Sequence, residues 1–183
     1  MFANLRYDFL RYSSRRFTLL AVLTRGLVNA GFRAVMLYRI GNWLRNHRLG
    51  ILAAIVERIM HHSCHCWIST AAQIGPGFLV AHVGGLVIGG PTRIGKNCDV
   101  RQNVTFGGNF SKKDIDGRTQ PWIGDNVSFG AGAVIAGPVK VGSGSIIGAN
   151  SVVTRDVPEN VIVSGVPASV IKQRWDESSG RKL

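Results

Sequence analysis

The chain has 183 residues, of which 45% are hydrophobic, 17% are charged and 23 are glycine. This composition excludes disordered chains, which are polar and highly charged, and the glycines lack the G-X-Y period of collagen. The formal net charge of +12 is concentrated in residues 1–60, where ten Arg face only Asp8 and Glu57. Such a balance suits an anionic partner, namely a membrane surface, a polyanionic substrate or a phosphorylated cofactor; solvated arginines on helix faces are the plainer interpretation.

The cysteine content and the hydropathy of the sequence limit the cellular compartments in which the protein is expected. The three cysteines are too few for a disulfide framework and suggest a reducing compartment. No run approaches the length of about 18 uncharged apolar residues that a membrane span needs, and the apolar stretch 17–24 is closed by Arg16 and Arg25. No convincing signal-peptide cleavage site follows it. We therefore expect a cytoplasmic protein that touches a membrane at most peripherally, at the inner face of the cell membrane.

Residues 1–65 form the first predicted domain, a basic helical section. Between residues 25 and 48, apolar residues recur every three or four positions with arginines largely between them, which is typical of an amphipathic helix with a basic face. The apolar residues are Leu27, Phe32, Val35, Met36, Ile40, Trp43 and Leu44, and the arginines are Arg25, Arg33, Arg39, Arg45 and Arg48. After Gly50 a second helix is predicted over 51–60. Two hypotheses stay open for residues 1–60: they pack on the protein or a neighbouring subunit, or they contact a membrane.

From Ile68 onward the period of the sequence changes to six residues. An aliphatic residue or Phe stands at each sixth position, usually followed by glycine or another small residue. These anchors are Ile68, Ile74, Val80, Ile94, Val100, Phe106, Ile123, Phe129, Ile135, Val141, Ile147 and Val153. A six-residue period indicates one short strand per hexad and coils of about 18 residues in a parallel β-helix. This second domain is predicted over 66–173, followed by a flexible tail over 174–183.

The six-residue phase breaks twice. Val80 and Ile94 are 14 residues apart, two more than two hexads, and Phe106 and Ile123 are 17 apart, one fewer than three hexads. An out-of-phase insertion must leave the wall of the solenoid, and loops raised on a rigid scaffold commonly carry sites. The first break contains AHVGGLVIGG, and the second predicts a protruding loop over 107–122.

The sequence resembles the hexapeptide-repeat acyltransferases, and within them the serine acetyltransferase branch. The resemblance covers about residues 66–173 and is carried by IGPGFLVAHVGGLVIGG, IGKNCDVRQNVTFGG, IGDNVSFGAGAVIAGPVKVGSGSIIGANSVVTRDVP and VSGVPASVI. It implies a mainly β protein, a left-handed parallel β-helix with an N-terminal α-helical section and a short C-terminal helix. It also implies a homotrimer that takes acetyl-CoA as co-substrate between neighbouring solenoids, with no metal.

His82 matches the family's catalytic histidine in the segment H-x-x-G-[IVL]-V-[IV]-G. Acyl transfer from a thioester to a hydroxyl needs a base for the hydroxyl proton, and imidazole serves near neutral pH. A lone histidine beside a β-wall is usually structural, but this one lies at a phase break and is the only histidine in the solenoid. We predict that His82 is the general base.

The resemblance also assigns residues to acetyl-CoA. Gly107 and Gly108 match the family's T-[LF]-G-G corner, where backbone N–H groups can approach an oxyanion. Small residues on later coils leave room for the pantetheine arm, and basic residues meet the nucleotide phosphates. The predicted cofactor-binding set is Gly107, Gly108, Gly130, Ala131, Ala149, Thr154, Arg155, Pro167 and Lys172. Each position also has a purely structural use in a solenoid.

Three departures from the serine acetyltransferase pattern concern the acceptor. Trp67 stands where the family has the aspartate that orients its histidine, and Gln120 replaces a second histidine. Only about 65 residues precede the solenoid, where serine acetyltransferases have a longer helical domain. In these respects the chain is more similar to capsule and exopolysaccharide acetyltransferases, which modify sugar hydroxyls, often on lipid-linked precursors. We expect Trp67, Asp114 and Asp116 on the acceptor side, with His82 oriented by a backbone carbonyl or by one of these aspartates, from its own chain or a neighbour's.

The main functional prediction is therefore an acetyl-CoA-dependent O-acetyltransferase acting on a saccharide or lipid-linked saccharide. The alternatives are a serine O-acetyltransferase of cysteine biosynthesis and a non-enzymatic, trimeric membrane-associated scaffold. A carbonic anhydrase of this fold needs three zinc histidines on the solenoid, but residues 66–173 contain only His82, so this activity is not expected. We also expect no nucleic-acid partner. The ligand-rich segment 61–67, HHSCHCW, cannot place all its side chains around one ion, so we predict a helix-to-solenoid junction there. Cys98 is predicted to lie in the core.

Overall fold

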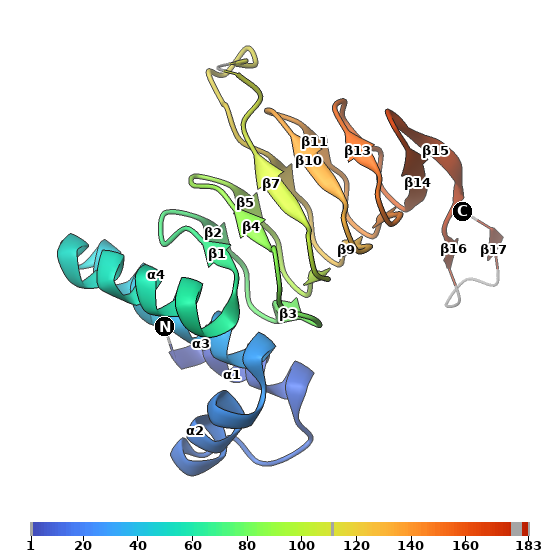
Figure 1. The fold of residues 1–183 in the computed structure, drawn as a ribbon. Coiled ribbons are helices and arrows are strands. Elements are labelled where there is room, and N and C mark those ends of the chain that lie inside the picture. Colours follow the sequence, from blue (N-terminus) through green and yellow to red (C-terminus); the bar gives the residue numbers. More distant parts are fainter. Residues whose placement is uncertain (1, 111, 177–180, 183) are drawn as a thin grey trace.

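The computed structural model describes residues 2–110, 112–176 and 181–182, which form a helical part and a solenoid (Figure 1). The helices are α1 (Phe2–Tyr12), α2 (Leu19–Val28), α3 (Ala30–Asn46) and α4 (Gly50–Cys64). The Asn29 side chain accepts a hydrogen bond from the Phe32 N–H at 2.8 Å and so begins a new helix at residue 30. The helical pattern predicted over 25–48 is therefore divided between α2 and α3. Among the helices of the described residues, none has both the length and the apolar character to cross a membrane.

Short strands follow from Trp67 and stack into three parallel sheets, as the hexads predict. Sheet 1 contains β1 (Trp67–Ile68), β4 (Val87–Ile88), β7 (Thr105–Gly107), β10 (Val134–Ala136) and β13 (Val152–Val153). Sheet 2 contains β2 (Gln73–Ile74), β5 (Arg93–Ile94), β8 (Trp122–Ile123) and β11 (Lys140–Val141). Sheet 3 contains β3 (Leu79–Val80), β6 (Asp99–Val100), β9 (Ser128–Phe129), β12 (Ile146–Ile147), β14 (Val161–Gly165) and β15 (Ala168–Gln173).

The inward residue of each hexad forms the core. Every predicted anchor from Ile68 to Val153 is at most 6% exposed. The Phe106 and Phe129 rings meet edge to face with centroids 4.8 Å apart. Cys98 is buried as predicted, and its burial raises the pKa of the thiol to about 11. Burial of this apolar ladder is the main force that holds the solenoid together.

Both phase breaks fall where the chain turns between sheets. After Val80 the next buried strand anchor is Ile88 of β4, so the two extra residues of the first break lie in the turn 81–86. A Cβ on Gly85 would lie 2.1 Å from Asn103 Oδ1, and its φ is 64°, so this turn requires glycine. The second break is the connection 108–121 between β7 and β8, which projects from the solenoid in Figure 1.

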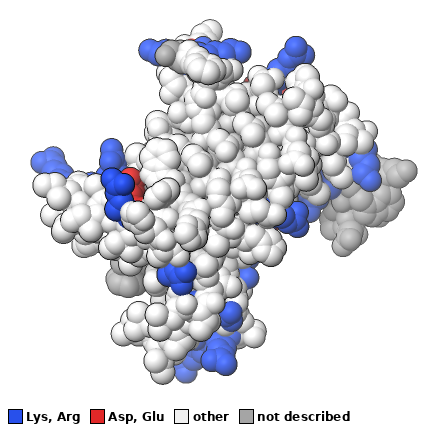
Figure 2. Space-filling view, viewed as in Figure 1, with Lys and Arg blue, Asp and Glu red and all other residues white. Residues whose placement is uncertain are grey.

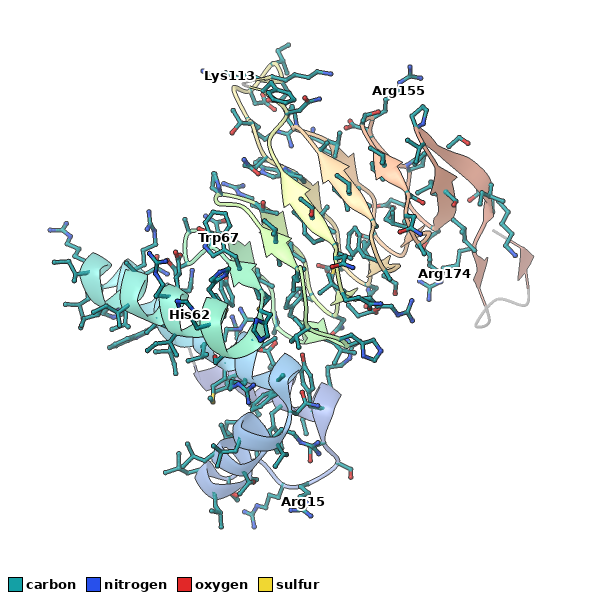
Figure 3. All side chains as sticks on the ribbon, in the orientation of Figure 1. Arg15, His62, Trp67, Lys113, Arg155 and Arg174 are labelled. Carbon is teal, nitrogen blue, oxygen red and sulfur yellow. The ribbon has the colours of Figure 1, made fainter. Side chains whose placement is uncertain are left out.

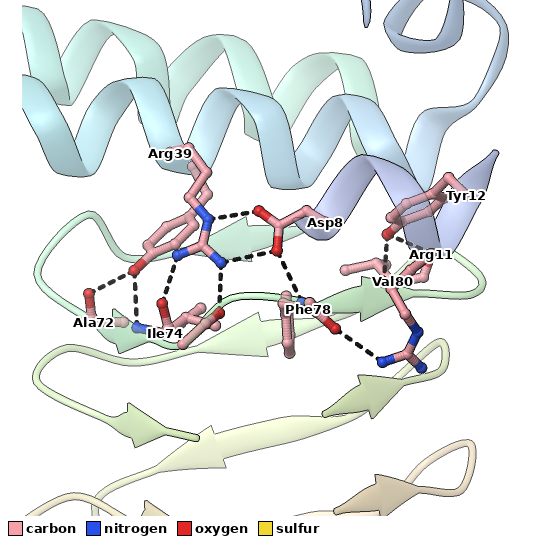
Figure 4. Close-up of polar contacts among 11 residues, drawn as sticks. Asp8, Arg11, Tyr12, Arg39, Ala72, Ile74, Phe78 and Val80 are labelled. Carbon is pink, nitrogen blue, oxygen red and sulfur yellow. Dashed lines mark hydrogen bonds and ion pairs between the residues drawn. The ribbon is translucent and has the colours of Figure 1, made fainter. Parts of the chain in front are cut away.

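A buried ion pair joins the helices to the first coil (Figure 4). Arg39 Nε donates to Asp8 Oδ2 at 2.8 Å, and the guanidinium also donates to the carbonyls of Ile74 and Gly75. Asp8 Oδ1 in turn accepts from the Phe78 N–H at 2.9 Å. The prediction of Arg39 on an exposed basic face is therefore wrong, because periodicity does not reveal a carboxylate on another helix.

Further side chains from the helices reach the same coil. The Tyr38 hydroxyl donates a hydrogen bond to the Ala72 carbonyl of the first coil at 2.8 Å. Burial raises the pKa of Tyr38 to about 12. The Tyr12 hydroxyl accepts from the Val80 N–H at 2.6 Å, and Arg11 Nη1 donates to the Gly77 carbonyl at 2.9 Å. The helices therefore cover the open backbone edge of the first coil.

The other end of the solenoid differs from the prediction. Where a short C-terminal helix is expected after Pro167, the chain forms β15, which pairs antiparallel with β14. A strand satisfies backbone groups of the last coil that a helix would leave open, which explains the difference. In the predicted tail, β16 (Trp175–Asp176) and β17 (Arg181–Lys182) form a separate antiparallel pair.

The segment 61–67 is the junction between helix and solenoid, as predicted. Helix α4 ends at Cys64, and His65 has a left-handed φ of 50° that turns the chain into β1. Among the described residues, no group of three or more His, Cys, Asp or Glu side chains is arranged to hold a metal ion.

Candidate active site

The chain turns from one sheet to the next along three edges of the solenoid. The His82 edge joins sheet 3 to sheet 1 and contains residues 81–86, 101–104, 130–133 and 148–151. The loop edge joins sheet 1 to sheet 2 and contains residues 69–72, 89–92, 108–121, 137–139 and 154–156. Neighbouring coils are separated by about 4.8 Å, so residues on one edge are stacked closely, while residues on different edges are a strand length apart.

The His82 side chain is exposed at the first break, on a turn whose backbone is fixed. The Gly85 N–H donates to the His65 carbonyl at 2.9 Å, and the Asn103 N–H donates to the Gly84 carbonyl at 2.8 Å. Within the described part of the chain, the imidazole itself forms no hydrogen bond. A single chain therefore presents the ring at a defined place and leaves both nitrogens available to a ligand or another subunit.

Gln102 is a residue of this edge that sequence reasoning missed. Val80 pairs with Val100, and the Ala81 N–H donates to the Val100 carbonyl at 2.9 Å. Gln102 therefore follows sheet 3 one coil after His82, at the same edge. Its Oε1 is buried and has no hydrogen-bond partner among the described residues. An amide oxygen in this state suits an N–H or O–H donor from an imidazole or a ligand.

The predicted cofactor residues divide between the two edges. Gly130, Ala131 and Ala149 lie on the His82 edge, and Pro167 lies in the β14–β15 turn at the same end of sheet 3. Gly107 ends β7 at the loop edge, where Gly108, Thr154 and Arg155 also lie. Lys172 pairs with Ile162 at the opposite end of sheet 3, so one chain does not bring it to Arg155.

Thr154 and Arg155 line a cavity of about 390 Å³ on the loop edge. Its charged lining residues are Lys112, Lys113, Asp114, Asp116, Arg118, Lys140, Arg155 and Asp156. Figure 3 shows Lys113, from the loop, and Arg155 at the same edge of the solenoid. This concentration of cations suits a phosphorylated ligand. The sequence did not reveal the three lysines, because nothing in the hexad pattern shows that the loop folds back over residues 154–156.

The loop aspartates lie away from His82 within one chain. Asp114 forms an ion pair with Arg118, and its Oδ1 accepts from the Arg118 N–H at 2.8 Å. Desolvation favours a higher pKa for Asp114, but the backbone and side chain of Arg118 outweigh it, so the pKa is lowered. Asp114 and Asp116 belong to the loop edge, whereas His82 belongs to another edge. Orientation of His82 by either aspartate would therefore need a neighbouring chain.

Trp67 lies close to the His82 turn, because its N–H donates to the Leu86 carbonyl at 2.8 Å. Its side chain is 44% exposed on the outer face of sheet 1. It lines a groove of about 450 Å³ with Glu57, Arg58 and His61 of α4. Figure 3 shows Trp67 on the strand that runs beside this helix.

Gln120, at the family's second histidine position, lies beside the predicted glycine corner on the loop edge. A Cβ on Gly108 would lie 3.1 Å from Gln120 Nε2, so the amide is in close contact with that glycine. Its Oε1 is buried without a hydrogen-bond partner among the described residues. Gln102 on the His82 edge and Gln120 on the loop edge therefore each have a buried amide oxygen that can accept a hydrogen bond from a ligand or another subunit.

Comparisons with known proteins agree with this architecture. The model of the bacterial transferase hexapeptide (six repeats) matches residues 120–155. Serine acetyltransferase of Synechococcus elongatus is 35% identical over 141 residues, covering 77% of this chain and 57% of that protein. Serine acetyltransferase of Bacillus pumilus is 37% identical over 157 residues, covering 86% of this chain and 69% of that protein. The crystal structure of serine acetyltransferase from Brucella abortus in complex with coenzyme A has a TM-score of 0.82 and 30% identity, covering 94% of this chain and 68% of that one.

These comparisons correct one branch of the resemblance. The chain spans between 50% and 57% of the length of the first curated relatives that it matches. These relatives are serine acetyltransferases, so the comparisons support that branch and not the capsule and exopolysaccharide branch. The stacked parallel sheets are consistent with the left-handed β-helix that the resemblance implies. The chain belongs to the hexapeptide-repeat transferase family, with serine acetyltransferases as its relatives.

Proposed function

We propose that the protein is an O-acetyltransferase that moves the acetyl group of acetyl-CoA to a hydroxyl, with L-serine as the favoured acceptor. The observation that carries this proposal is His82, whose exposed imidazole stands on a fixed turn at the first phase break. The match to serine acetyltransferases supports serine over a sugar as acceptor. Acetyl-CoA as donor is supported by the coenzyme A complex of the Brucella relative.

His82 would act twice in the reaction. Its imidazole takes the proton from the acceptor hydroxyl as that oxygen bonds to the thioester carbonyl carbon. Backbone N–H groups at the Gly107–Gly108 corner of a neighbouring copy would stabilise the oxyanion that results. When the carbon–sulfur bond breaks, His82 returns the proton to the departing thiolate. The products are the acetyl ester and the free thiol of coenzyme A, so His82 ends in its starting state.

The division of the predicted residues between two edges supports a site built from two chains. His82 and the Gly107–Gly108 corner lie at opposite ends of sheet 1, and a hexad of extended chain spans up to about 20 Å. That separation is too great for both to act on one carbonyl within one chain. The His82 edge of one copy beside the loop edge of another would join them and would cover the exposed imidazole. This arrangement supports the homotrimer that the family resemblance implies.

Arg155 is expected to bind a phosphate of the coenzyme A moiety through the cationic cavity. Arg155→Ala should raise KM for acetyl-CoA about tenfold and change kcat little, because one charge-assisted contact contributes about 1.5–3 kcal/mol to binding. Initial rates over a range of acetyl-CoA concentrations measure both constants. Lys96→Ala is the matched control, since Lys96 is exposed outside both site edges. An unchanged KM in Arg155→Ala would remove Arg155 from the donor site.

A saccharide hydroxyl is the second candidate acceptor, and Trp67 is the observation that favours it. An indole face flanked by Glu57, Arg58 and His61 suits a sugar ring, which has apolar C–H faces and a rim of hydroxyls. Serine needs no aromatic platform, and the family's aspartate is absent from this position.

Thiol release from acetyl-CoA, with L-serine or with glycans and lipid-linked oligosaccharides, tests the proposed acceptor. We expect serine-dependent release by the wild-type chain. Trp67→Asp restores the family carboxylate and should raise kcat/KM for serine about tenfold or more through one charge-assisted hydrogen bond. Release with saccharides alone, lost in Trp67→Asp, would overturn serine in favour of the sugar. Failure of every acceptor to stimulate release would overturn both.

A further inference from the structure

Helix α2 has an outer surface that the proposed reaction does not use. Its inner side, including Val22 and Gly26, is buried against α1 and α3. On its outer side, Leu19, Leu20, Leu27 and Val28 are between 73% and 79% exposed, and Leu23 is also exposed. A contiguous group of apolar side chains left exposed on a helix commonly marks an interaction site. The exposed side of α2 therefore indicates a partner.

An arginine cluster lies next to this apolar face. Arg6, Arg15 and Arg16 line a cavity of about 420 Å³ with Leu10, Ser14 and Phe17, in α1 and the α1–α2 connection. The ion pairs found among the described residues join other partners: Arg11–Asp99, Arg39–Asp8 and Arg118–Asp114. Three guanidinium groups around one concavity are well suited to phosphate oxygens.

The helical section keeps its acidic groups away from this surface. Residues 1–60 contain two carboxylates, and Asp8 is buried against Arg39. Glu57 accepts a hydrogen bond from the Thr70 N–H of the solenoid. In Figure 2, the lower end of the molecule, formed by α2 and its connection to α1, shows basic and no acidic side chains. A second copy applied by the same face in a twofold contact would place arginines against arginines, so an anionic partner is favoured over that contact.

We propose that this surface docks on the anionic face of a phospholipid bilayer. We call it the α2 docking face, and it consists of Leu19, Leu20, Leu23, Leu27, Val28, Arg6, Arg15 and Arg16. The apolar side chains enter the boundary between head groups and acyl chains, and the arginines bind head-group phosphates. With 10 residues α2 is about 15 Å long, half the thickness of a bilayer core, so it lies on the membrane and does not cross it. This proposal does not depend on the acetyl acceptor.

Vesicle binding by the full chain tests the proposal directly. The protein is mixed with vesicles of phosphatidylcholine alone, or with about one third phosphatidylglycerol, and the bound fraction is measured by flotation. We expect binding to the anionic vesicles that weakens as salt is added. Arg15→Gln/Arg16→Gln should weaken binding about 25-fold, since each basic residue near the surface contributes a factor of about five. Leu19→Gln/Leu20→Gln should weaken it at least about tenfold through lost apolar burial.

Matched variants at the far end of the α3–α4 hairpin test whether the position of the substitutions matters, or only the loss of positive charge or apolar surface. Arg45→Gln/Arg48→Gln and Ile51→Gln/Leu52→Gln make the same chemical changes at exposed positions and should bind like the wild type. Circular dichroism checks that each variant is folded. The proposal is overturned if the wild type ignores anionic vesicles, or if control and docking-face variants weaken alike. It is also overturned if Leu19→Gln/Leu20→Gln lowers the oligomeric mass in sedimentation while no vesicle is bound, because the face then joins copies of the chain.

Discussion

Replacement of His82 by alanine is expected to lower kcat about 10²- to 10⁴-fold, the range found when a general base is removed. His82 lies on an exposed turn, so truncation should leave the fold and the acetyl-CoA affinity largely intact. The loss should therefore appear in kcat and kcat/KM with little change in KM for acetyl-CoA. Steady-state rates of thiol release measure these constants.

His47→Ala is the control for this variant, because His47 is an exposed histidine that follows α3 and is outside the residues of both site edges. It should retain the wild-type rate. A pH profile adds a second readout: the acid limb of kcat/KM that reports the general base should disappear in His82→Ala. A folded His82→Ala protein with unchanged kcat and an unchanged acid limb would refute the assignment.

Replacement of Asp8 by alanine is expected to lower the free energy of unfolding by about 3–5 kcal/mol. Asp8 is fully buried, and its carboxylate binds both Arg39 and the Phe78 N–H, so its removal leaves a buried guanidinium and a backbone donor without their acceptor. For a chain of this length the melting temperature should fall by about 10 °C. Thermal unfolding followed by circular dichroism measures the change.

The Arg11–Asp99 pair supplies the comparison for the buried ion pair. Its charged atoms are 3.8 Å apart and both side chains are partly exposed, so Arg11→Ala should cost about 1 kcal/mol. Equal destabilisation by Asp8→Ala and Arg11→Ala would mean that the buried pair has no special role in fastening the helices to the solenoid.

The hexad pattern predicted the solenoid well because each strand is a local unit. Residues such as Ile123 and Phe129 are buried by the same rule at every coil, so a short stretch of sequence is enough to recognise it. The two phase breaks also fell at the turn of His82 and at the protruding loop. Arg39 and the strand after Pro167 were predicted wrongly, because their surroundings come from distant parts of the chain.

The sequence named candidate site residues one by one but did not predict their arrangement. The resemblance assigned His82, Thr154 and Arg155, yet it did not show that they stand on different edges. Lys140 and Gln102 escaped notice because their roles depend on which coils and loops meet in space. Sequence motifs indicate which residue types could react or bind, whereas the charged and polar neighbours of each residue are known only from the folded structure.

Both ends of the solenoid are at least partly covered by other parts of the chain, and this has a consequence for how copies can associate. A stack of parallel coils with a bare end would be a template for adding further strands, as in a growing fibril. Here Arg39, Tyr38 and Arg11 occupy carbonyls of the first coil, while β15 runs antiparallel along the last. Elongation along the axis is therefore hindered at the first coil and, within sheet 3, at the last coil. This favours assembly along the flanks of the solenoid, where the His82 edge and the loop edge lie.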